Sequence, residues 1–184
     1  MKRVMPLCWL GFCFLLVGCV TTPNNGAKAN SASLEVSFAD PQWTGRWIPK
    51  GQQCQRFGGD GSTPALHVKN IPAEADAIIM EYSDRDYPPM DFGGHGKIGY
   101  RIQPGTAEVT IPPVPGHSFD LPQGFFLVEP HRNPMWDKAG AYMPPCSGGR
   151  GNYYYVTVLA VKMPEGGGKK KTVLAKKILG LGTY

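Results

Sequence analysis

Hydrophobic and polar positions alternate in short runs along most of this chain, which is the pattern of half-buried β-strands. The residues SLEVSF at 33–38 alternate with period two, and YYYVTVLAVKM at 153–163 is the longest β-rich run. Further apolar runs, bounded by Pro, Gly or Asp, lie at 65–71, 76–83, 97–102, 107–111 and 124–129. We therefore expect each of these segments to form a strand, with 153–163 in the interior of a sheet.

Helix breakers are frequent, with 24 Gly and 18 Pro in 184 residues. They exclude long helices across most of the chain. Only KKKTVLAKKILGLG at 169–182 is compatible with a short helix, after a flexible loop, PEGGGKKK, at 164–171. The pattern predicts an all-β fold of the sandwich or barrel-like type.

The first residues have the features of an export signal. A basic MKR precedes an apolar run, residues 4–15, which is too short for a confident membrane span. LVGC at 16–19 then resembles a bacterial lipobox, so we expect residues 1–18 to be cleaved and Cys19 to be acylated, for example with palmitate. The alternative is an ordinary secretory signal followed by a chance cysteine.

The predicted lipoprotein has a simple layout. Residues 19–33 are small, polar and unpatterned, as in a flexible tether, and residues 34–184 are enough for one domain. Position 20 is Val rather than the Asp of the inner-membrane retention signal, so we expect a lipid-anchored envelope protein at the outer membrane, facing the periplasm.

The formal net charge of +5 depends on a lysine-rich C-terminal segment. Such a segment either contacts anionic lipid or, as we favour, is a solvated stretch that aids solubility. Basic and aromatic residues are not interleaved, so we expect no nucleic-acid partner. The lysines concerned are Lys169, Lys170, Lys171, Lys176 and Lys177.

Two cysteines remain after Cys8 and Cys13 leave with the signal and Cys19 is lipidated. In an oxidising compartment, Cys54 and Cys146 are a candidate disulfide, and the alternative is two separate thiols. Neither lies in a CxxC or CxxH setting, and the histidines lack HxH, HxxxH or HExxH spacing. We therefore expect no metal site and no cofactor.

The segment SDRDYPPMDFGGHG at 83–96 holds the strongest candidate for a functional site. Asp84 and Asp86 end an apolar strand, and in extended backbone residues two apart point the same way. His95 returns after a Pro- and Gly-rich loop and is a candidate hydrogen-bond donor to the two acids. The alternative is that the acids only cap turns and that His95 is an incidental loop residue.

The same segment resembles the phosphatidylethanolamine-binding protein family, also called the Raf-kinase-inhibitor-like family. That family has a strand ending in D-P-D-A-P, a short loop and then H-W or H-F. Here the residues run from Asp84 through Asp86 to Pro88, followed by His95 and Gly96. The preceding GGDGSTPALHVKNIPAEADAIIMEYS also resembles the family pattern D-G-x-x-x-S-P-x-L, a V-P-A-G-like turn and a strand.

A second family motif is G-P-x-P-P, a glycine-rich turn and H-R-Y before a long strand. AYMPPCSGGRGNYYYVTVLAV at 141–161 resembles it, with Pro145 in the proline wall and Tyr154 as the motif tyrosine. Asn152 replaces the motif histidine and Tyr153 replaces the arginine. The resemblance covers about residues 34 to 184 and ends with the G-T-Y that closes the chain.

The resemblance implies a large antiparallel sheet packed on a smaller one, with a pocket that binds a small anion or a phospholipid head group. It implies that an Asp paired with His95 raises the pKa of the imidazole, so that His95 donates to an anion. Arg85 and Tyr87 depart from the motif, adding a cation near the mouth and bulk to the pocket. The implied pocket residues are Asp84, Asp86, Pro88, His95, Pro145, Asn152 and Tyr154.

Three functions follow from these expectations. The first is an envelope lipoprotein that binds a small anion or lipid head group without chemistry. The second is a protein-interaction or inhibitor module with a degenerate pocket, and the third is a hydrolase that uses Asp84, Asp86 and His95. Asn152 argues against the third, because an amide cannot act as a general acid.

Overall fold

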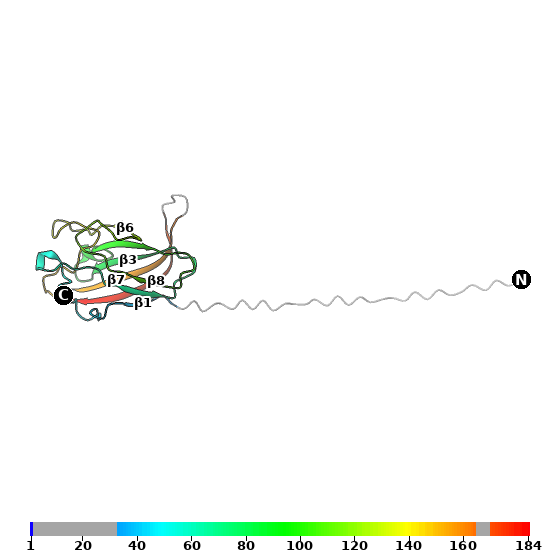
Figure 1. Ribbon diagram of the computed structural model, residues 1–184, viewed down its shortest axis with the longest axis horizontal. Helices are drawn as coiled ribbons and strands as arrows, with labels where there is room; N and C mark the ends of the chain where they lie inside the picture. The colour runs from blue at the N-terminus through cyan, green and yellow to red at the C-terminus, as the bar shows by residue number, and fades with distance from the viewer. Residues whose placement is uncertain (2–32, 165–169) are drawn as a thin grey trace. The chain divides into compact units, whose positions relative to one another are not determined.

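The computed structural model of this chain describes Met1, residues 33–164 and residues 170–184 (Figure 1). The predicted signal peptide, Cys19, almost all of the tether, Lys169 and the centre of the PEGGGKKK segment lie outside the described residues. Within the described part, no helix is both long enough and apolar enough to cross a membrane.

The domain consists of two antiparallel sheets. A three-stranded sheet has the order β1-β2-β5, and a five-stranded sheet has the order β6-β4-β3-β7-β8. Every segment expected to form a strand does so, which confirms the all-β fold with a large and a small sheet. The strands are β1 (Glu35–Phe38), β2 (Leu66–Lys69), β3 (Ala77–Asp84), β4 (Gly96–Arg101), β5 (Glu108–Ile111), β6 (Phe125–Glu129), β7 (Tyr153–Lys162) and β8 (Thr172–Thr183), with short 3-10 turns η1 (Gln55–Phe57) and η2 (Pro88–Met90).

The sequence allowed at most a short helix at 169–182, and the described part of this segment forms β8 at the edge of the large sheet instead. It pairs with β7 from Tyr153↔Thr183 to Lys162↔Thr172. The long exposed edge of β7 offers a complete hydrogen-bond ladder, and this non-local pairing overrides local helix propensity. Lys176 and Lys177 are exposed on β8, where charge protects an edge strand from pairing with another chain.

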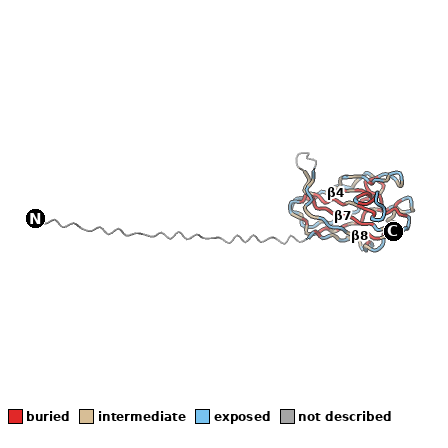
Figure 2. The backbone as a smooth tube through the Cα atoms, turned by 180° about the vertical axis from the view of Figure 1, so that it is seen from behind, coloured by how far each residue is buried: buried red, intermediate tan, exposed pale blue. Residues whose placement is uncertain are grey.

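The main hydrophobic cluster draws residues from both sheets, including Leu66 of the small sheet and Met80 and Val158 of the large one. Strand β3 is buried on both faces, since Ala77 and Ile79 belong to a separate cluster. Figure 2 shows this buried interior in red along the strands. A strand buried in this way is rigid, so the side chain at its end is held in a fixed direction.

A disulfide joins Cys54, just before η1, to Cys146, in the loop that precedes β7. The two Cα atoms are 5.2 Å apart across a sequence separation of 92 residues. Closing a loop of that length stabilises the folded state by about 4.6 kcal/mol in the chain-entropy model. The bridge therefore fixes two loops that carry no regular secondary structure.

Candidate functional site

A cavity of about 330 Å³ lies where β3 ends and β7 begins. This volume is at the small end of the range for ligand pockets, and it suits a head group rather than a large molecule. Thirteen residues line the cavity: Asp84, Asp86, Tyr87, Met90, His95, Asn133, Trp136, Met143, Cys146, Ser147, Arg150, Asn152 and Tyr154.

Asp84 is buried at the end of β3, with an exposed fraction of 3 %. Residues two apart on a strand point to the same face, so Asp84 lies on the face of Met80 and Tyr82, whose side chains belong to the main core. One carboxylate oxygen accepts a hydrogen bond from the Asp86 amide at 2.9 Å, and the other accepts from the Asn152 side-chain amide at 2.8 Å. N–H donors therefore satisfy both oxygens of this buried carboxylate.

Asp86 also lines the cavity, but it is exposed. Its carboxylate accepts a hydrogen bond of 2.7 Å from the Tyr153 amide, the first residue of β7. The expectation that an imidazole donates to the two acids is therefore corrected. Backbone amides and Asn152 are the donors to these carboxylates, and the carboxylates tie β3 to the start of β7.

His95 is buried and its Nδ1 lies 2.7 Å from the Met143 carbonyl oxygen. Because a carbonyl can only accept, Nδ1 carries the hydrogen, and in the neutral ring Nε2 is an acceptor. The expected rise in the pKa of His95 is wrong. Burial is the largest influence and lowers the pKa to about 4, outweighing the Met143 carbonyl and the charge of Asp84, which both raise it.

Tyr154 packs edge-on against His95, with ring centroids 5.3 Å apart. Its hydroxyl oxygen accepts a hydrogen bond of 3.1 Å from the Cys146 amide, and the Ser147 and Asp84 side chains lie within hydrogen-bonding reach of the same hydroxyl. Burial raises the pKa of the Tyr154 hydroxyl above its ordinary value. Tyr154 is therefore a neutral donor at physiological pH.

The remaining predicted residues divide between the cavity and its surroundings. Asn152 lines the cavity, whereas Pro88 and Pro145 are not among the lining residues. Pro88 begins η2, and the Pro145 carbonyl accepts a hydrogen bond from the Cys54 amide. Arg85, the expected cation near the mouth, does not line the cavity, and its Cζ lies 4.3 Å from the centroid of the Tyr155 ring. The arginine that lines the cavity is Arg150.

Several lining residues were missed from the sequence. Arg150 and Ser147 lie in the loop before β7, which the second motif indicates only as a glycine-rich turn. Trp136 comes from the loop after β6, and its indole N–H donates to the Cys146 carbonyl at 3.1 Å. No pattern in the sequence links Trp136 to the cavity, because the loop is irregular.

Comparison with known proteins identifies the fold. No family model matches the sequence, and no curated protein matches it. The structure is similar to a Chlamydia trachomatis protein described as a phosphatidylethanolamine-binding protein homologue, at 22% identity and a TM-score of 0.50, covering 83% of this chain and 97% of that one. It is also similar to E. coli YbcL, described as a member of that family, at 19% identity and a TM-score of 0.54, covering 83% and 98%. The chain therefore has the phosphatidylethanolamine-binding protein fold.

Proposed function

We propose that this chain, which has the fold of phosphatidylethanolamine-binding proteins, is a member of that family and binds a small phosphate-bearing ligand. The observation that carries the proposal is the cavity where buried Asp84, His95 and Tyr154 lie together with Arg150 and Asn152. Asp84, His95 and Tyr154 match residues of the family motifs described above, and the chain has the fold of that family.

The cavity favours an oxyanion that also donates a hydrogen bond. Arg150, the Tyr154 hydroxyl and the second N–H of Asn152 are donors for anionic oxygens. The Asp84 carboxylate and the neutral His95 Nε2 are acceptors. Two unit negative charges 4 Å apart repel by about 4 kcal/mol near a protein surface, so an oxyanion without a proton or ammonium is disfavoured beside Asp84. A phosphate monoester in its monoanionic form, or phosphoethanolamine with its ammonium group, meets this requirement.

Binding without chemistry is the role that these groups support best. A general acid at neutral pH needs a pKa near 7, and burial lowers the pKa of His95 to about 4. Asn152 replaces the titratable histidine of the family motif, and one of its side-chain N–H groups donates to Asp84. Both features favour a fixed recognition surface over proton transfer.

The proposal is tested by calorimetry with phosphoethanolamine, inorganic phosphate and sulfate between pH 5.5 and pH 8. We expect the two phosphate compounds to bind and sulfate to bind at least tenfold more weakly, since sulfate carries no proton or ammonium to donate. Affinity for inorganic phosphate should fall as pH rises across this range, because its singly charged form gives way to a doubly charged form that is repelled more strongly by Asp84. The affinity falls with rising pH because the ligand form expected to bind is the more protonated one.

Arg150→Gln provides the matched variant for this experiment. Losing a charge-assisted hydrogen bond costs about 1.5–3 kcal/mol, so we expect affinity to fall by roughly tenfold to a hundredfold. Arg46→Gln, at an exposed position over Trp47, is the control and should leave affinity unchanged. If phosphate and sulfate bind equally, or neither binds, the pocket is not a phosphate site and the alternative of a protein-interaction module is favoured.

We also propose that the protein is lipid-anchored at Cys19 in the cell envelope, facing the periplasm. The lipobox-like LVGC supports this, and the disulfide is typical of proteins in oxidising compartments. In this setting a membrane-tethered domain would meet phospholipid head groups at high local concentration.

A further inference from the structure

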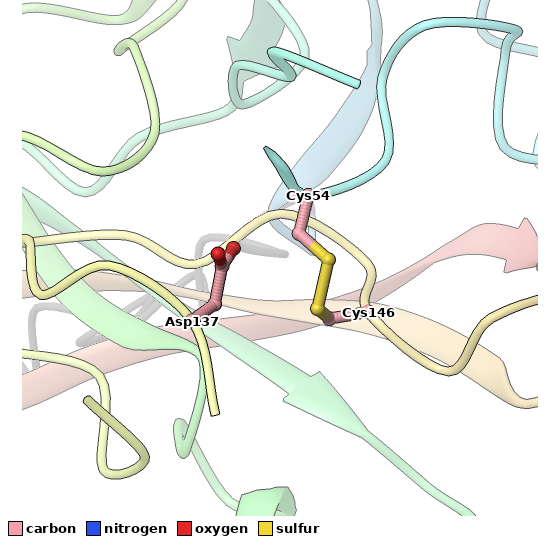
Figure 3. Close-up of side chains that lie close together, drawn as sticks. All are labelled: Cys54, Asp137 and Cys146. Carbon is pink, nitrogen blue, oxygen red and sulfur yellow. A yellow bond between two sulfur atoms is a disulfide. The ribbon is translucent and has the colours of Figure 1, made fainter. Parts of the chain in front are cut away.

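A separate group of polar side chains lies at the Cys54–Cys146 disulfide. The carboxylate of Asp137 lies beside the bridge, on a different loop (Figure 3). Both sulfur atoms and a carboxylate oxygen are within 4.8 Å of one another. The Asp137 side chain is only 6 % exposed. A disulfide has no hydrogen to donate, so a hydrogen bond to this buried carboxylate has to come from another group.

His117 completes this group. Its Nε2 lies 2.6 Å from an Asp137 carboxylate oxygen, and its side chain is 1 % exposed. The contact orients the carboxylate and supplies a donor for one oxygen. Carboxylates that bind metal ions are in turn usually hydrogen-bonded by a neighbouring group, as Asp137 is here by His117.

Hydrogen bonds that do not involve the sulfur atoms hold the three ligand-bearing loops together. The Cys54 amide donates to Pro145, next to Cys146, at 3.0 Å. The Trp136 indole donates to the Cys146 carbonyl at 3.1 Å, and the Arg56 guanidinium donates to the Trp136 carbonyl at 3.0 Å. Breaking the S–S bond therefore leaves Cys54, Cys146 and Asp137 close together.

We propose that Cys54, Cys146 and Asp137 form a metal site for a thiophilic divalent ion such as Zn²⁺, which opens when the disulfide is reduced. A dithiol reductant supplies two electrons and two protons, forms its own disulfide, and leaves two thiols on the protein. The ion then displaces both thiol protons and takes two thiolates and one carboxylate as ligands. This inference does not rest on the phosphate proposal, because it concerns the reduced protein, and Cys146 is the one proposed ligand that also lines the cavity.

The ligand set fits zinc in type and in scale. Tetrahedral zinc binds thiolate at about 2.3 Å and carboxylate at about 2.0–2.2 Å, which requires the sulfur atoms to separate to about 3.8 Å. With the Cα atoms 5.2 Å apart, rotation of the cysteine side chains provides that separation without moving the backbone. Cys146 also lines the cavity, which gives the ion and the reductant a route to the site.

Cobalt provides a spectroscopic test on the purified protein. We expect the protein reduced with a phosphine to bind one Co²⁺ with thiolate charge-transfer absorption and tetrahedral d–d bands, and to release it to one equivalent of Zn²⁺. The oxidised protein should show neither absorption. Asp137→Asn should weaken cobalt binding at least tenfold, whereas Asp120→Asn, at an exposed position, should leave it unchanged.

Three results would overturn the proposal: no cobalt spectrum in the reduced protein, equal affinity in the Asp137→Asn variant, or the same spectrum in the oxidised protein. Near-ultraviolet circular dichroism, recorded on the same samples, reports whether the reduced protein keeps its fold. If reduction unfolds the protein, the proposal requires one equivalent of Zn²⁺ to restore the native spectrum in the wild type and not in Asp137→Asn. Failure of that rescue also overturns it.

Discussion

At the scale of single residues, His95 is held by the backbone on several sides. Its amide donates to the Tyr82 carbonyl at 3.0 Å, and its carbonyl accepts from the Met143 amide at 2.9 Å. With Nδ1 on the Met143 carbonyl, the ring has one orientation and one tautomer. A fixed neutral imidazole is an acceptor of constant geometry, which suits recognition of a ligand that carries a proton.

The charge state of His95 leads to a prediction for acid stability. Its pKa is about 4 in the folded protein and about 6.5 when unfolded. The unfolded state therefore binds the proton first, so stability is fully present above about pH 6.5 and is lost as pH falls towards 4. We expect the His95 imidazole signals in NMR to titrate below pH 5, whereas a midpoint at or above 6.5 would contradict the burial argument.

His95→Gln gives a second readout of the same effect. The variant should be less stable at pH 7, but the decline in its free energy of unfolding between pH 6.5 and pH 4 should be shallower than in the wild type. His67→Gln, on the partly exposed face of β2, is the matched control and should keep the wild-type decline. Denaturant unfolding at several pH values measures both slopes.

At the scale of elements, β1 to β7 could be predicted from the sequence, whereas β8 could not. Alternation between buried and exposed positions is a local property, so β1 and β7 could be recognised from their own residues. The sequence of β8 has Leu, Ala and Lys, which suit a helix equally well. Its conformation is set by the free edge of β7, which no local pattern reveals.

The candidate site shows the same division. Asp84 and Tyr154 could be predicted because strands place them, and the two are register partners across β3 and β7. The surroundings that set the pKa of His95 include Met143 and Tyr154, which come from later segments of the chain. Trp136 lies in a loop without a repeating pattern, so its place at the cavity could not be predicted.

Gly99 of β4 leads to a prediction about the large sheet. The ring of Phe126, from β6, lies over Gly99 so closely that a Cβ there would collide with it. We expect Gly99→Ala to lower the free energy of unfolding by about 1–3 kcal/mol, the usual cost of overpacking, although Ala normally suits a strand better than Gly. Urea unfolding measures the change.

A double-mutant cycle with Phe126→Ala separates this collision from other effects. Without the ring, the space over Gly99 is empty, so the added methyl group should cost little or be favourable. A coupling free energy of at least about 1 kcal/mol is expected between the two positions. Additive effects would mean that the aromatic ring moves aside without strain.

At the scale of the whole molecule, the domain combines a well-packed interior with a cavity formed by strand ends and loops. The disulfide joins two of those loops, so the wall that contains Cys146 is fixed by a covalent bond. The envelope location proposed above is an oxidising compartment, in which such a bridge forms, and the proposed metal site opens only where a dithiol reductant acts on it.

The proposed lipid anchor leads to a prediction about the whole chain. Wild-type protein should partition with membranes and into detergent, and its mature N-terminal peptide should begin at Cys19 and carry acyl chains in mass spectrometry. Cys19→Ser should move the protein into the soluble fraction with its fold intact, because the described domain begins well after this residue. An unmodified Cys19 in the membrane fraction would contradict the anchor.

Tyr184 lies beside the loop that contributes Ser147 and Arg150 to the cavity. The Tyr184 carbonyl accepts hydrogen bonds from Ser147 at 2.6 Å and from the Gly151 amide at 2.8 Å, while its amide donates to Asn152 at 3.1 Å. The loop that carries Arg150 is thus fastened to residue 184. A fluorophore attached at residue 184 would lie beside this loop, so we expect its emission to change when a ligand binds in the cavity. The labelled protein would then report ligand binding optically.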